Sequence, residues 1–262
     1  MRGISFIYDG VPSEEYGLGL VYLGNDDDLY PSGSGVDIVT DRAIRNAQEI
    51  MLSAEETPVL EFEFCAVSEE PLDGATVSKA KQWLFGPLSF RRLQVCLDDF
   101  RHLYFNCVLT ADGDYAYMGG VYGFKVKAVC DAPFAWEFPR FISGTVSSAD
   151  DHVDFYNTSA DSEDLMPILR FNMAESGSFS ISNLSYEGRI FMFSDLDAGE
   201  EITVDNRLGI ITSSVGHGRL AKFNKRFIRL KPGYNHLVVS APIGTYYEIE
   251  YTNAVRMGGA LC

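Results

Sequence analysis

The sequence has no long apolar run, and it contains few cysteines and histidines. The absence of any run near 20 apolar residues excludes a transmembrane helix. The segment from Met1 to Phe6 includes neither the apolar core nor the small-residue cleavage site of a signal peptide. We therefore expect the chain to remain at first in the reducing cytosol of the cell that makes it.

Cysteine is scarce, and its spacing suggests no pairing. The cysteines are odd in number, lie far apart and include no CxxC pair; they are Cys65, Cys96, Cys107, Cys130 and Cys262. Cys65, Cys107 and Cys130 stand among apolar residues in strand-like segments. These features favour small buried thiols over a disulfide framework or a zinc site.

Histidine is also scarce. His102, His152, His217 and His236 lie in four separate segments, and none has the spacing of metal ligands. No serine has the sequence context of a nucleophile elbow, and an acidic chain produces carboxylate pairs by chance. We therefore predict no catalytic residue, no metal site and no cofactor, and we expect the protein not to be an enzyme.

Positive charge is deficient along most of the chain. The 21 basic and 37 acidic residues give a formal net charge of −16. Residues 1–137 contain 10 basic and 22 acidic residues, a net charge of −12, and residues 138–262 contain 11 and 15, a net charge of −4. Such a balance argues against a nucleic-acid partner and against insertion into a membrane.

Strand-forming patterns dominate what is present. Aromatic residues make up 13% of the chain, and apolar residues alternate with polar ones in many short segments. We predict a hairpin over residues 3–23 and strands over residues 58–67, 90–97, 103–109, 121–130, 165–172, 177–183, 189–193, 201–204, 210–212, 237–240 and 246–251. Residues 111–114 are predicted as a turn and residues 147–154 as a polar link. The fold class is therefore mainly β.

One helix is expected, over residues 75–85. Val77, Ala80, Trp83 and Leu84 recur with helical spacing and form one apolar face. Asp73 or Thr76 is a suitable N-cap, and the Gly-Pro pair that follows ends the helix. An amphipathic helix of this kind packs across a sheet.

A boundary between two domains is indicated near the middle of the chain. The strand over residues 121–130 stops at an Asp-Ala-Pro turn, because proline cannot donate to a ladder. Phe134, Trp136 and Phe138 follow as an aromatic cluster, and we interpret them as packing between the domains. The domains are then residues 1–137, with the helix, and residues 138–262, whose short, evenly spaced strands are typical of a β-sandwich.

One basic segment stands out against the acidic background. Six of the 11 basic residues after position 137 fall within thirteen positions; they are Arg219, Lys222, Lys225, Arg226, Arg229 and Lys231. Apolar residues are interleaved with them. We rank a solvated strand face first, a protein-contact edge formed by the first five second, and a nucleic-acid stripe a distant third.

Several segments, taken in order, resemble one known family. They are Phe6 to Gly10 with Tyr16 to Leu18, Ala80 to Phe85, Leu93 to Phe105, Phe124 to Trp136, Ile202 to Asp205, and Phe227 to Asn235. The family is the distal tail proteins of long-tailed, siphovirus-type bacteriophages, and the resemblance extends over nearly the whole chain.

The resemblance implies a structural role at the distal end of the phage tail. It implies an N-terminal β domain with a crossing helix that forms a hexameric ring, and a C-terminal galectin-like or carbohydrate-module-like β-sandwich outside it. The implied partners are other copies of the chain, the tail tube protein, fibre or receptor-binding proteins and the tape measure protein. The implied location is the virion, after assembly in the host cytoplasm. The family also favours strand over helix for residues 44–52.

The alternative function is a carbohydrate-binding adhesion module that recognises host cell-wall sugars. A sugar site usually needs an aromatic platform, and both tryptophans, Trp83 and Trp136, precede the second domain. The second domain also lacks a galectin-type His/Asn/Arg cluster, although Tyr234 or Tyr246 remains as a candidate platform. These features favour a docking module over a sugar-binding one.

Overall fold

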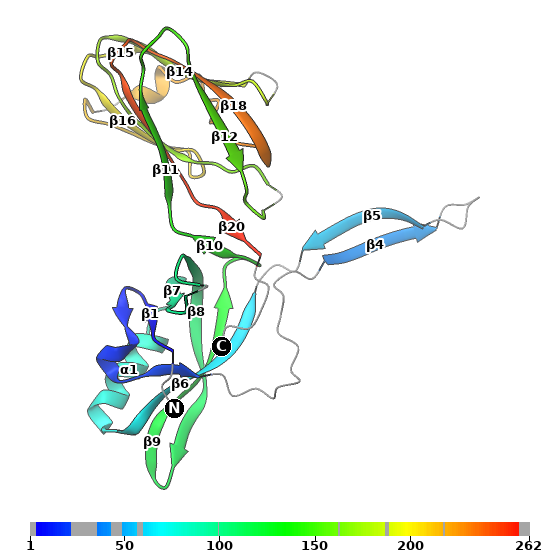
Figure 1. The fold of residues 1–262 in the computed structure, drawn as a ribbon, viewed down its shortest axis with the longest axis vertical. Helices are drawn as coiled ribbons and strands as arrows, with labels where there is room; N and C mark the ends of the chain where they lie inside the picture. The colour runs from blue at the N-terminus through cyan, green and yellow to red at the C-terminus, as the bar shows by residue number, and fades with distance from the viewer. Residues whose placement is uncertain are drawn as a thin grey trace. The chain divides into compact units, whose positions relative to one another are not determined.

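The protein is mainly β, with one α-helix among the residues that the structure describes (Figure 1). The computed structural model describes residues 4–21, 36–42, 49–56, 60–98, 100–161, 163–186, 189–216 and 218–256. These residues form two compact units. The first runs to Glu137 and resumes at Val255, and the second is Phe138–Ala254. No helix in the described part of the chain is long and apolar enough to span a membrane.

The first unit is built on one sheet with the strand order β2-β1-β7-β8-β9-β6-β3. Its elements are β1 Phe6–Tyr8, β2 Val11–Pro12, a 3₁₀ turn η1 Ser13–Tyr16, β3 Gly19–Val21, β6 Glu61–Leu72, α1 Gly74–Phe85, β7 Arg91–Val95, β8 Leu103–Tyr117, β9 Gly120–Cys130 and β10 Ala135–Glu137. Strand β10 pairs with β8 and with β20 Ala254–Val255. Strands β4 Val36–Arg42 and β5 Glu49–Glu56 form a separate two-stranded sheet.

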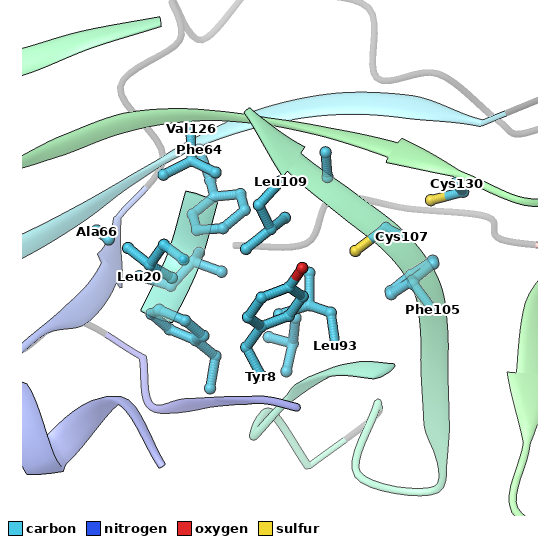
Figure 2. Close-up of a cluster of buried hydrophobic side chains, with 14 of the residues drawn as sticks. Tyr8, Leu20, Phe64, Ala66, Leu93, Phe105, Cys107, Leu109, Val126 and Cys130 are labelled. Atoms are coloured by element: carbon cyan, nitrogen blue, oxygen red, sulfur yellow. The ribbon is translucent and has the colours of Figure 1, made fainter. Parts of the chain in front are cut away.

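A pair of backbone hydrogen bonds joins the segment before β1 to β3, the last strand of this order. Ile4 N–H donates to the Leu20 carbonyl at 2.9 Å, and Leu20 N–H donates to the Ile4 carbonyl at 2.7 Å. Ile4, two residues before β1, therefore pairs with Leu20 of β3, the last strand of the order. The apolar side chains of the sheet consequently face a shared interior, in which Tyr8, Leu93, Phe105 and Leu109 converge (Figure 2).

Helix α1 covers this interior, and Trp83 fixes it there. The indole lies between the Phe6 ring, 5.8 Å away at an interplanar angle of 10°, and the Tyr16 ring, 4.8 Å away at 17°. Trp83 Nε1–H also donates to the Tyr8 carbonyl at 3.0 Å. Ala80 and Leu84 are fully buried on the same helix face. Aromatic packing and burial of this apolar face, more than helix propensity, therefore hold α1 in place.

The structure confirms the predicted helix and its cap. Asp73 is the N-cap, and its Oδ1 accepts from the N–H groups of Ala75 and Thr76 at 2.8 and 2.9 Å. These bonds hold the pKa of Asp73 below its usual range, with the Thr76 bonds as the largest cause. The helix ends at Phe85, before Gly86, as the Gly-Pro pair indicates.

Two predictions for the first unit are wrong in detail. Strand β8 continues through the predicted turn at residues 111–114, with a bulge at Asp112, between Ala111 and Gly113. The turn lies instead at Met118 and Gly119, which both have positive φ, as a two-residue hairpin turn requires. The predicted hairpin over residues 3–23 is also divided, because β1 pairs with β2 and β7, while β3 pairs with β6.

The strand predicted within residues 44–52 is confirmed from Glu49 onward, where β5 begins; residues 44–48 lie outside the described residues. The cysteine prediction is confirmed for Cys65, Cys107 and Cys130, which are buried and free. Burial raises the pKa of the Cys130 thiol to about 12 and that of Cys107 further, so neither thiol is reactive. Cys96 is partly exposed, and Cys262 lies outside the described residues.

The second unit consists of two sheets packed face to face. One has the order β11-β19-β13-β16-β17 and the other β12-β18-β14-β15. Their strands are β11 Arg140–Thr145, β12 Asp151–Asn157, β13 Ile168–Asn172, β14 Gly177–Asn183, β15 Arg189–Leu196, β16 Glu201–Asp205, β17 Ile210–Ser213, β18 Gly233–Ser240 and β19 Tyr246–Tyr251. Phe171 of β13 stacks on Phe179 of β14 at 3.9 Å between ring centroids, so the two inner faces share one core.

Two strands of the second unit escape prediction from the sequence. Strand β11 was not expected, and β12 occupies much of the predicted polar link at residues 147–154. Strand β11 exposes Phe141 and has Ile142 as its one large apolar residue that is partly buried. Strand β12 has only Val153 and Phe155 as strongly apolar inward residues. A short strand with so few apolar residues gives a weak alternating signal.

We predict that Trp83→Ala lowers the free energy of unfolding of the first unit by about 3 kcal/mol, the low end for removing a large packed aromatic. Trp83→Phe should lower the free energy of unfolding by less, because an aromatic ring remains in the stack and only the hydrogen bond to the Tyr8 carbonyl is lost. Urea unfolding followed by circular dichroism measures both. Phe90→Ala is the control, since Phe90 is an exposed aromatic; an equal loss in that variant contradicts the role assigned to Trp83.

Candidate functional site

The basic segment identified in the sequence is not a strand face. It begins with a 3₁₀ turn, η2 Arg219–Ala221, and continues as irregular backbone. Isolated bridges join Phe223 to Phe193 and Leu230 to Leu165. Phe223 and Leu230 are buried in the core of the second unit. The interleaved apolar residues Phe223 and Leu230 therefore pack into the core and hold the irregular segment against the two sheets.

Buried asparagines take the place of a strand ladder along this segment. Asn206 Oδ1 accepts from the Ile228 N–H at 2.9 Å. Asn183 Nδ2 donates to the Arg229 carbonyl at 3.1 Å, and Asn157 Nδ2 donates to the Leu230 carbonyl at 3.2 Å. Irregular backbone beside a core leaves polar groups that must be satisfied. Side-chain amides, which have both donors and acceptors, meet this need.

Arg219 is an internal ion-pair partner. Its Nη2 lies 2.7 Å from Asp197 Oδ2, and its Nε lies 2.5 Å from Oε1 of Glu200, which is fully buried. The Ser213 hydroxyl donates to the same Glu200 oxygen at 2.6 Å. The hydrogen bond to Asp197 first, and the charge of Glu200 next, raise the pKa of Arg219. Arg219 therefore holds η2 against the turn that precedes β16.

The other four basic residues of the predicted contact edge differ in exposure. The Lys222 ammonium donates to the Asp195 carbonyl. Arg229 is half-buried, with Nη1 3.8 Å from Asp164 Oδ2. Lys225 and Arg226 are exposed, and Lys225 has a left-handed backbone with φ of 60°. The segment thus presents two exposed cations, Lys225 and Arg226.

The three aromatic residues at the domain boundary lie in different places. Phe134 is buried in the first unit, where its ring meets Trp136 edge-on at 6.4 Å and the Arg256 guanidinium lies 5.5 Å from the ring centroid. Trp136 is on β10, and its Nε1–H donates to Asp131 Oδ1 at 3.3 Å. Phe138 is the first residue of the second unit. Their role as packing between the domains stays a prediction.

A cluster that the sequence analysis missed lies on strands β12 and β18, which are neighbours in the four-stranded sheet (Figure 1). The register places Asp154 opposite His236 and Tyr156 opposite Tyr234, with His152 two residues along β12 from Asp154. Asp154 Oδ1 accepts from the Tyr234 hydroxyl at 2.6 Å and lies 2.5 Å from His236 Nδ1. His236 Nε2 lies 3.1 Å from His152 Nδ1.

The protonation pattern of this cluster follows from its contacts. A carboxylate only accepts hydrogen bonds, so His236 Nδ1 bears a proton and donates to Asp154. In neutral His236, Nε2 is then an acceptor, and His152 Nδ1–H donates to it. The Tyr234 hydroxyl first, and His236 second, hold the pKa of Asp154 below its usual range. The bond to Asp154 in turn raises the pKa of Tyr234.

The face around this cluster has almost no charge. The outward positions of β12, β18 and β14 are His152, Asp154, Tyr156, Tyr234, His236, Val238, Ser240, Ser178, Ser180 and Ser182. Asp154 is the one carboxylate in this set, and the set includes no lysine or arginine. The other sheet instead presents ionic groups outward, such as Arg170 with Glu248 and Glu250 at 3.0 and 2.6 Å.

The sequence alone does not connect these histidines, because His152 and His236 are 84 residues apart. Only the register of β12 on β18 brings them together. His152, Asp154 and Tyr156 recur at every second position, which is the spacing of a strand. The predicted polar link at residues 147–154 overlooks this spacing. His102 is an exposed residue of the first unit, and His217 lies outside the described residues.

Comparison with known proteins gives family matches over nearly the whole chain. Residues 1–132 match the family model of a phage tail protein N-terminal domain, and residues 134–251 match that of a phage tail C-terminal domain. No curated protein matches the chain.

Among solved structures, the fold is similar to that of the Dit protein (gp 19.1) of phage SPP1, described as a paradigm of hub adsorption apparatus in Gram-positive-infecting phages. The TM-score is 0.68 at 12% sequence identity, and the match covers 96% of this chain and 99% of that one. At this identity the match establishes a shared fold. The resemblance predicted from the sequence is thereby confirmed at the level of the phage tail family and of the fold.

We predict that Arg219→Ala lowers the free energy of unfolding of the second unit by about 3 kcal/mol, because buried Glu200 then loses its cation. Lys225→Ala and Arg226→Ala should each change it by less than about 0.5 kcal/mol, as exposed positions do. Thermal and urea unfolding measure all three. Equal effects at the three positions contradict the structural role of Arg219.

We also predict that the Asp154 carboxyl titrates below the ordinary aspartate pKa, and that Tyr234→Phe raises its pKa by removing the largest cause. A folded-state pKa below the unfolded value stabilises the fold above the unfolded pKa. That stabilisation is lost as pH falls through the folded pKa. NMR titration of the carboxyl carbon measures the shift. Tyr246→Phe is the control, because Tyr246 donates to Glu248 on the other sheet; a shift of Asp154 in that variant rejects the local cause.

Proposed function

The chain belongs to the phage tail protein family whose two domain models it matches, and from that premise we propose that it is the distal tail hub. In this role six copies form a ring that joins the tail tube to the baseplate, fibre or receptor-binding proteins at the tail tip. The hub is a structural component of the virion, without catalytic activity, and it assembles in the host cytoplasm.

One observation supports the hub role above all others. The shared fold extends over almost the full length of both this chain and a phage protein described as a hub paradigm, so the likeness includes both units. A tail tube or capsid protein that shared only one of the two units would match this chain over only part of this chain's length. Fold likeness at low identity is an analogy for function, so the hub role needs a direct test.

We assign the ring to residues 1–137 and the docking role to residues 138–262. Strands β4 and β5 pair with each other and with no other described strand. A two-stranded hairpin alone is marginally stable in water. Contact with a neighbouring copy of the chain would stabilise this hairpin, as a ring provides.

The second unit, a two-sheet sandwich that we class as galectin-like, then faces outward as the docking module. The exposed cations Lys225 and Arg226 are candidates for contact with acidic neighbours such as fibre or receptor-binding proteins. The tail tube and tape measure proteins would contact the ring. Phe134, Trp136 and Phe138 would set the angle between the ring and the docking module.

We predict a hexamer of the full chain by native mass spectrometry, six times the 29.1 kDa protomer. The same measurement is repeated with the tail tube protein added, to include a hexamer that forms only on that partner. Gold-labelled antibody on intact particles should mark the distal tail end. Label elsewhere on the particle, or a stable assembly with another copy number, contradicts the hub.

A further inference from the structure

The nearly uncharged face of strands β12, β18 and β14 has the composition of a sugar-binding surface. We propose that it binds a neutral glycan, with Tyr156 and Tyr234 as the aromatic platform and with Asp154, His236 and His152 as polar contacts. This is a further function beside the hub role, and it uses residues to which that role assigns nothing.

Charge selects the class of ligand. The protein has a net charge of −16, yet Asp154 is the single fixed charge at the outward positions of the three strands. An anionic ligand would find no lysine or arginine there. A cationic ligand would find Asp154, already occupied by Tyr234 and His236, and Asp150, which precedes β12 and accepts from the Ser240 hydroxyl. A neutral ligand with many hydroxyl groups matches a surface of serine, tyrosine and imidazole.

Two exposed tyrosines supply the apolar part of such a site. Tyr156 and Tyr234 lie directly opposite each other on neighbouring strands and are 66% and 51% exposed. Pyranose rings have a face of C–H bonds that packs on the electron-rich face of an aromatic ring. Cross-strand partners lie about 5 Å apart at Cβ, so the pair offers a platform about one sugar ring wide.

The polar contacts are preorganised beside this platform. Asp154 Oδ1 fixes both Tyr234 and His236, and no hydrogen bond among the described residues uses Asp154 Oδ2. The second oxygen is thus an acceptor for a sugar hydroxyl. His152 is held through Nδ1, which leaves Nε2 for the ligand. Side chains fixed before binding lose little entropy when a ligand binds.

A protein partner is the competing occupant of this sheet. Ile190 and Met192 on β15 are large apolar residues at exposed outward positions next to β14. A protein surface would cover them together with the tyrosines, whereas a sugar of one or two rings would bind at the tyrosines alone. Substitutions at β15 therefore separate the two occupants.

The test uses the full chain on an array of neutral oligosaccharides and isolated bacterial cell-wall polysaccharides, followed by calorimetric titration of the best neutral oligosaccharide. We expect Tyr156→Ala and Tyr234→Ala each to weaken binding at least about tenfold, with a similar loss in Asp154→Asn. Tyr246→Ala, at an exposed tyrosine of the other sheet, and Met192→Ser should leave affinity unchanged. Unchanged unfolding transitions show that each variant is folded.

Several results would overturn the proposal. The proposal is wrong if no neutral glycan on the array binds. It is also wrong if binding is unchanged in both tyrosine variants. Binding that falls equally in Met192→Ser, or capture of another tail protein through the tyrosines, assigns the face to a protein. None of these outcomes bears on the copy number or position of the chain in the tail, so the hub role is tested separately.

Discussion

The closure of the first unit depends on the indole of Trp83, held between the rings of Phe6 and Tyr16. Sheet strands bring together the apolar residues of segments far apart in sequence, and one face of that assembly needs a cover. Helix α1 supplies it, and Trp83 joins the helix to β1 by stacking and by its bond to Tyr8. A ring built from this unit needs its edges in fixed positions, which requires the helix to stay docked.

The second unit meets a different constraint, the need to satisfy the backbone of a long irregular segment beside its core. Asn157, Asn183 and Asn206 supply side-chain hydrogen bonds where no ladder exists. Buried Glu200 and Arg219 fix the start of the same segment. The inner faces of the two sheets thus form the core, the irregular segment closes one side, and the outer faces remain for contact with other molecules.

Much of the fold could be predicted from the sequence, because the signals were local. Helix α1 has a cap, an apolar face and a stop, and strands such as β14 and β19 have clear alternation. Strand β12 was missed because its outward residues are polar and its inward ones few. The contact between His152 and His236 could not be predicted, because packing across the whole sheet sets the register between distant strands. Arg219 was misjudged because sequence gives charge but not burial.

We propose that the two units form a hub, with one module for the tail tube and another for the tail tip. The family match establishes a phage tail protein, and the distal position is our proposal. Electron cryo-microscopy of the intact tail tests this position most directly. The account predicts six copies in a ring at the distal end of the tube, with the first unit in the ring and the sandwich outside it. Density for the chain elsewhere in the tail, or in a ring of another copy number, would contradict it.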